Sequence, residues 1–144
     1  MTERRLYLLR HAKSSWKNEG LADHDRPLAR RGRRAASAIG RHLREQRVAP
    51  ELVLCSTARR ARETLERIEP ELGSGAIRAE PELYGAPALD LLARLHEIAP
   101  SVRSVMVIGH NPGLEQLALR VARDRKSTRL NSSHSLLSRM PSSA

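Results

Sequence analysis

Residues 6–11 read Leu-Tyr-Leu-Leu-Arg-His, a short apolar run that ends in an arginine and a histidine. A run of this length is too short for a stable helix and is typical of a buried strand. Similar runs occupy residues 52–55 and 105–108, and they are followed by Ser-Thr-Ala-Arg-Arg and by Gly-His-Asn. Each of these predicted buried strands is therefore followed directly by polar or charged side chains that can bind a ligand or act in catalysis.

Amphipathic segments alternate with these strands. Apolar residues recur at helical spacing in residues 30–46, 58–68, 87–98 and 113–123. A shorter strand is predicted around Ile77. The alternation predicts an α/β fold of three layers, in which a mostly parallel sheet is covered by helices on both faces.

Parallel strands bring their carboxyl ends to one edge of a sheet, and ligands of such folds bind beyond that edge. Arg10 and His11 follow the first strand, an arginine pair that includes Arg60 follows the second, and His110 follows the fourth. We therefore expect these side chains to share one pocket. Guanidinium groups neutralise phosphate oxygens and an imidazole can attack phosphorus, so this pocket would suit a phosphoryl group.

The length and composition fit one globular domain. The chain has 144 residues, of which 40% are hydrophobic and 29% charged, and this excludes wholesale disorder. No apolar stretch approaches the ~18–20 residues that cross a bilayer, so no membrane association is expected. The N-terminus has no pattern of a secretory signal, and the single Cys55 allows neither an internal disulfide nor a cysteine framework for zinc. We expect a cytoplasmic protein.

The net charge of +10 raises the question of nucleic-acid binding. A surface that stacks bases needs aromatic side chains among its arginines. The chain has no phenylalanine, one tryptophan and two tyrosines. We therefore interpret the excess charge as a solvated basic surface and expect no nucleic-acid partner.

The composition changes after residue 124. Residues 125–144 hold seven of the 14 serines and four cationic residues, with no acidic residue. Such a segment has too little apolar surface to offset the entropy of ordering it. We expect a domain over residues 1–124 and a disordered Ser/Arg-rich tail over 125–144, either a foreign appendage or a natural flexible tail.

Four separated blocks of sequence resemble the motifs of one known family. Residues 8–14 resemble the Arg-His signature of the histidine phosphatase superfamily, which has the phosphoglycerate mutase-like fold, and their Ala-Lys-Ser ending is similar to the small SixA-type phosphohistidine phosphatases. The other three blocks follow in the family's order, at residues 25–32, 56–64 and 107–113. The resemblance covers residues 5–122. It implies a phosphatase that needs no metal ion or cofactor.

The resemblance also implies a role for each matched residue. His11 would be the nucleophile that accepts the phosphoryl group, and water would then hydrolyse the phosphohistidine. Arg10 and Arg60 would hold the phosphate oxygens. Arg60 is chosen over Arg59 because it stands four residues before the threonine of its block. His110 would donate a hydrogen bond or place positive charge beside the transferring group.

Three further residues are candidates for the site, and two of them have two interpretations each. Glu82 stands near the position where larger family members keep an acidic residue, and it is either a general acid or a loop carboxylate. Ser14 either binds phosphate or braces its loop. Asn111 precedes a predicted helix whose N-terminus favours an anion, and it is a candidate for substrate binding.

The resemblance implies as substrate either phosphohistidine in a partner protein or a small phosphorylated metabolite. The alternatives are a metal-dependent hydrolase built on His11, His110 and Asp25, a nucleic-acid-binding module, and, within the family, a phosphoglycerate mutase. Family members continue with another strand after the helix that follows the second histidine. The serine-rich tail stands in that place, so the sheet is expected to lack its last strand. The oligomeric state is left open.

Overall fold

Four parallel strands form the centre of the sheet. The computed structural model describes residues 4–124, 129–131 and 135–139. The parallel strands are β1 (Arg5–Arg10), β2 (Leu52–Ser56), β3 (Ala76–Glu80) and β4 (Ser104–Gly109). The strand order is β3-β2-β4-β1-β6-β5, and β1 pairs with β4 while β2 pairs with both β4 and β3. The predicted α/β fold with a mostly parallel sheet is confirmed.

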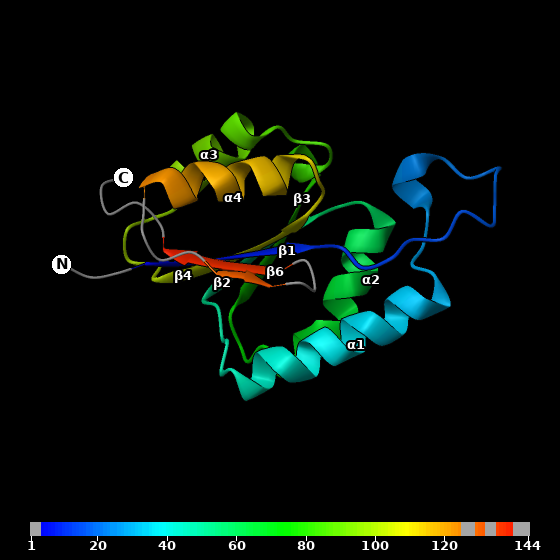
Figure 1. The fold of residues 1–144 in the computed structure, drawn as a ribbon, viewed down its shortest axis with the longest axis horizontal. Coiled ribbons are helices and arrows are strands. Elements are labelled where there is room, and N and C mark those ends of the chain that lie inside the picture. Colours follow the sequence, from blue (N-terminus) through cyan, green and yellow to red (C-terminus); the bar gives the residue numbers. More distant parts are fainter. Residues whose placement is uncertain (1–3, 125–128, 132–134, 140–144) are drawn as a thin grey trace.

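Helices cover both faces of this sheet. Figure 1 shows α1 (Arg30–Glu45) and α2 (Arg59–Ile68) on one face, and α3 (Ala88–His96) and α4 (Gly113–Asp124) on the other. Three short 3₁₀ turns, η1, η2 and η3, complete the helical elements at Asp23–Asp25, Glu69–Glu71 and Pro81–Leu83. None of the helices in the described part of the chain is long and apolar enough to cross a membrane.

The side chains of β1 divide between two cores, as the two-residue period of a strand requires. Leu6 and Leu8 belong to the cluster under α3 and α4, whereas Tyr7 and Leu9 belong to the cluster under α1 and α2. All four side chains are buried. A central strand covered on both faces has no polar side, and for this reason residues 6–9 read as an unbroken apolar run.

The two remaining strands lie in the segment predicted to be a disordered tail. β6 (Ser135–Arg139) pairs antiparallel with β1, and β5 (Arg129–Asn131) pairs antiparallel with β6. The structure describes these two stretches as strands, and the rest of 125–144 lies outside the described residues. The division into a domain over residues 1–124 and a disordered tail over 125–144 stays a prediction. Without β6, the backbone N–H and C=O groups on this edge of β1 would be unpaired, and such an edge attracts a further strand. The origin of the segment and the absence of a native last strand stay predictions.

The carboxyl ends of β1, β2 and β4 meet at one edge of the sheet. In the register of the β1–β4 pair, Arg10 lies opposite Gly109, and the backbone N–H of His11 donates to the carbonyl of Gly109 at 3.1 Å. β2 ends at Ser56, beside β4. The residues that follow these strands are thus held next to one another by backbone pairing, as the sequence predicted.

Candidate active site

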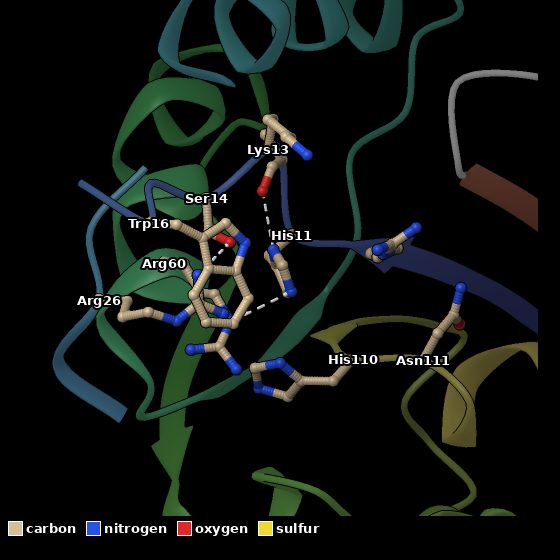
Figure 2. A pocket seen from close by; sticks show the side chains of 10 residues that line it. His11, Lys13, Ser14, Trp16, Arg26, Arg60, His110 and Asn111 are labelled. Carbon is tan, nitrogen blue, oxygen red and sulfur yellow. Dashed lines mark hydrogen bonds between the residues drawn. The ribbon is translucent and has the colours of Figure 1, made fainter. Parts of the chain in front are cut away.

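A pocket of about 400 Å³ lies at this edge of the sheet (Figure 2). Its lining residues are Arg10, His11, Ala12, Lys13, Ser14, Trp16, Arg26, Arg60, His110 and Asn111. The four residues expected to share a site, Arg10, His11, Arg60 and His110, are all among them. The lining contains cationic and neutral side chains and no carboxylate among the described residues, so the pocket suits an anion.

Hydrogen bonds fix the ring of His11 in one tautomer. Its Nδ1 lies 2.7 Å from the backbone carbonyl of Ala12, which can only accept, so Nδ1 carries the ring proton and donates it. On the other side of the ring, Nε of Arg60 donates to Nε2 at 3.2 Å. Nε2 is therefore the nitrogen with a lone pair, and it faces a guanidinium group inside the pocket.

The surroundings also keep His11 neutral. Burial, followed by the positive charges of Arg60, Arg10 and Arg26, lowers the pKa of His11 from 6.5 to about 4. Each cause disfavours the charged imidazolium, and together they outweigh the hydrogen bond to Ala12 that favours it. The imidazole therefore holds an available lone pair at neutral pH, which a nucleophile requires.

Arg60 comes from the first turn of α2 and is almost completely buried. Besides His11, it binds Asp23: Nη1 donates to the backbone carbonyl at 2.6 Å and Nη2 donates to Oδ2 at 3.0 Å. Its neighbour Arg59 is exposed and pairs with Glu63 at 3.0 Å, away from the pocket lining. This difference agrees with the choice of Arg60 over Arg59.

His110 stands beside His11, with 5.1 Å between the ring centroids. Its Nε2 lies 2.8 Å from Oγ of Ser56, and this hydroxyl accepts from the backbone N–H of Ala58 at 3.2 Å. The other ring nitrogen of His110 is Nδ1. That nitrogen is buried and has no hydrogen-bond partner within the described chain.

Burial, the neighbouring His11 and Arg60 lower the pKa of His110 to about 4 as well. Both imidazoles would take up a proton near pH 6.5 when unfolded and only near pH 4 when folded. Between these values the unfolded chain binds more protons, so we expect the free energy of unfolding to fall as the pH drops from about 6.5 to 4.

Urea denaturation at pH 7.0, 6.0 and 5.0 measures this loss of stability. The His11→Asn variant should show a shallower pH dependence, because it removes one of the two shifted groups. A ring of His11 that titrates at pH 6.5 in the folded protein, measured by NMR, would contradict the prediction.

The structure shows the surroundings of Ser14, Asn111 and Glu82. Ser14 is buried and its Oγ accepts from Nη1 of Arg26 at 2.8 Å, so it braces the pocket wall. Asn111 lines the pocket, but its Oδ1 accepts from the N–H of Glu115 at 3.1 Å and so caps α4. Glu82 is not brought to the pocket: it is exposed on η3, where the adjacent Leu83 takes the inward position in the core.

Sequence reasoning missed Arg26, Trp16, Asp23 and Tyr84. Arg26 stood in one of the quoted blocks but was interpreted only as the approach to a helix. The guanidinium of Arg26 is buried under the indole of Trp16, with its carbon 3.5 Å from the ring centroid. The one available signal was the composition, since Trp16 is the only tryptophan of the chain.

The described residues contain no cluster of ligands that would support the alternative of a metal-dependent hydrolase. Asp25 pairs with His24 at 3.7 Å and is absent from the pocket lining, so it does not join His11 and His110. Within the described ranges, no group of three or more His, Cys, Asp or Glu is placed to hold a metal ion.

Comparisons with known proteins agree with this geometry. The model of the histidine phosphatase superfamily (branch 1) matches residues 6–86. An uncharacterized protein of Mycobacterium tuberculosis is 40% identical over 114 residues, which cover 79% of this chain and 70% of that protein.

Solved structures show the same fold. The proposed phosphohistidine phosphatase SixA from Agrobacterium tumefaciens is 34% identical, with a TM-score of 0.79 over 85% of this chain and 79% of that chain. The protein histidine phosphatase SixA complexed with tungstate is 28% identical, with a TM-score of 0.73 over 81% and 76% of the two chains. The family match and these structures together establish that the chain belongs to the histidine phosphatase superfamily and is of its SixA type.

Proposed function

We propose that the protein is a metal-independent phosphatase that carries the phosphoryl group covalently on Nε2 of His11. The observation that carries this proposal is the state of the His11 ring: its proton is held on Nδ1 by Ala12, and its Nε2 faces Arg60. A neutral, oriented imidazole in a cationic pocket has the properties of a phosphoryl acceptor.

The reaction proceeds in two displacements. In the first, the Nε2 lone pair forms a bond to phosphorus, and the bond to the leaving group breaks with its electron pair. In the second, water attacks phosphorus, the Nε2–P bond breaks, and the electron pair returns to Nε2 as inorganic phosphate is released. Once Nε2 is bonded to phosphorus it can no longer accept from Arg60, so the Nε–H of Arg60 becomes a donor to a phosphoryl oxygen.

Arg10, Arg60 and His110 stabilise the charge on the transferring group. A loose phosphoryl-transfer transition state spreads negative charge over three oxygens, and fixed cations and donors are the main source of catalysis there. The two guanidiniums line the pocket beside His11, and Nδ1 of His110 supplies a further donor. The tungstate found in the SixA relative is a tetrahedral oxyanion, which supports the same use of this pocket.

The pocket lining favours a leaving group that needs no carboxylic acid. An alkyl ester leaves as an alkoxide and needs a proton from the enzyme, and positioned general acids contribute about 10²–10⁴-fold. No carboxylate lines the described pocket. A phosphoramidate nitrogen can be protonated before it leaves. We therefore propose phosphohistidine in a cytoplasmic partner protein as the substrate, ahead of a small phosphomonoester.

Three substrates presented in parallel test this proposal: a phosphohistidine peptide, an aryl phosphate and an alkyl phosphate, each with and without a chelator. We expect chelator to have no effect, and the alkyl phosphate to react at least about 10²-fold more slowly than the other two. Activity that disappears with the chelator would overturn metal independence. An alkyl phosphate hydrolysed as fast as the peptide would overturn the choice of substrate.

A further inference from the structure

The carboxylate of Asp23 receives hydrogen bonds from three side chains at once. Nε of Arg26 donates to Oδ1 at 3.1 Å, Nη2 of Arg60 donates to Oδ2 at 3.0 Å, and the hydroxyl of Tyr84 also donates to Oδ2. These bonds hold the pKa of Asp23 far below its ordinary value, with the Tyr84 bond as the largest cause. Asp23 is thus a permanent anion shared by two guanidiniums, and it is not part of the pocket lining.

Asp23 holds Arg60 from the side opposite His11. Its backbone carbonyl and its Oδ2 accept from the two terminal nitrogens of the guanidinium, while Nε points to Nε2 of His11. A planar guanidinium that is bound at both terminal nitrogens cannot rotate about its own axis without breaking those bonds. The direction of the Nε–H toward His11 is therefore set by Asp23.

Tyr84 connects this arrangement to the second histidine. Its ring meets the ring of His110 edge-on, with 5.4 Å between centroids, and it meets His24 in the same way at 4.9 Å. The guanidinium carbon of Arg60 lies 5.9 Å from the centroid of the Tyr84 ring. Residue 84 follows η3 and residue 23 opens η1, so one hydrogen bond joins two loops that lie 61 positions apart in the sequence.

We propose that Asp23, held by Tyr84, is a positioning residue that aims Arg60 at the phosphoryl group carried between His11 and His110. The proposal rests on the proposed function, because it assigns Arg60 a contact with that group. Asp23 itself contacts no substrate. Its effect on the reaction passes through Arg60, and this dependence is what an experiment can detect.

A double-mutant cycle measures that dependence. The variants are Asp23→Asn, Arg60→Gln and the double variant, with Asp25→Asn as a matched control that removes the same charge two residues away. The readouts are the affinity for tungstate, measured by calorimetry, and kcat/KM on an aryl phosphate. Two residues that act through one contact show non-additive effects, whereas independent structural roles add.

We expect Asp23→Asn to lower kcat/KM by about 10²-fold in the wild-type background, the factor that a displacement of about 1 Å costs. In the Arg60→Gln background, Asp23→Asn should lower kcat/KM by less than about threefold, because the arginine that Asp23 positions is already absent. Tungstate affinity should follow the same pattern. Asp25→Asn should change neither readout by more than about twofold, as is usual for exposed sites away from such contacts.

The proposal would be overturned if Asp23→Asn lowered kcat/KM and tungstate affinity equally in the wild-type and Arg60→Gln backgrounds. It would also be overturned if Asp23→Asn lowered them in neither background. Tyr84→Phe provides the second variant in case Asp23→Asn fails to fold, since it removes only the hydroxyl that holds Asp23, and it should show the same non-additivity. Tungstate binding requires no turnover. A wild-type protein that binds tungstate without hydrolysing the aryl phosphate would refute the proposed function and still leave the role of Asp23 measurable.

Discussion

Replacement of His11 by asparagine is expected to lower the rate of phosphate release by about 10⁴-fold or more, the scale seen when a covalent nucleophile is removed. Nε2 of His11 is the ring nitrogen that carries the lone pair, and it faces the guanidinium of Arg60 inside the pocket. Asparagine has no comparable nucleophile. The variant should retain much of the affinity for tungstate, because Arg10 and Arg60 still line the pocket.

Rapid quenching of the reaction followed by phosphorus NMR of the protein tests this prediction directly. The wild-type protein should show a phosphorus signal bonded to an imidazole nitrogen, and the His11→Asn variant should show none. His96→Asn is the matched control, since this histidine is exposed on α3 and lies outside the pocket lining. A phosphohistidine that persists in His11→Asn, or a rate that does not change, would place the nucleophile elsewhere.

The fold and the central residues of the site could be predicted because they depend on local patterns. The buried strands are continuous apolar runs, and strand ends at one edge of a parallel sheet meet regardless of how far apart they lie in the sequence. Arg10, His11 and His110 each directly follow or end such a strand, and Arg60 lies at the start of the helix after another. Strand pairing brings Arg10, His11 and His110 together, and the start of α2 after β2 adds Arg60.

The residues that support this site could not be predicted in the same way. Asp23 and Tyr84 belong to loops, and their meeting depends on where the side chains of two irregular segments point. No periodicity or strand register fixes that geometry. The same reason accounts for Glu82. It stands near the position where larger family members keep an acidic residue, but the turn of η3 sends Leu83 into the core and leaves Glu82 exposed.

The segment after residue 124 shows another limit of reasoning from composition. Its serines and its lack of acidic residues predict disorder, yet the structure pairs residues 135–139 with the edge of β1. Backbone hydrogen bonds do not depend on the side chains of the added strand, and composition therefore does not exclude pairing. Only the structure shows which edge is available.

Substitution of Gly32 by alanine is expected to destabilise the protein by about 1–3 kcal/mol, the usual cost of forcing an extra carbon into a packed position. A Cβ on Gly32 would lie 2.0 Å from the backbone carbonyl oxygen of Lys13 and 2.9 Å from its carbonyl carbon. That same oxygen accepts from the N–H of Ala29 at 2.9 Å, so it cannot move away without losing a hydrogen bond. The clash outweighs the ~1 kcal/mol that alanine gains over glycine inside a helix.

The loss of activity should exceed what the loss of stability explains, because Lys13 follows His11 by two residues. Moving the Lys13 carbonyl also moves Ala12, whose own carbonyl holds the proton on Nδ1 of His11. We expect kcat/KM to fall by about 10²-fold at a temperature where the variant remains folded. Gly40→Ala is the control on the same helix: its nearest contact is 3.2 Å and lies on α2, so stability should change by less than about 1 kcal/mol and kcat/KM should not change. A Gly32→Ala protein with wild-type activity would show that residues 11–14 adjust without disturbing His11, and the packing of α1 against this loop would then have no part in orienting the nucleophile.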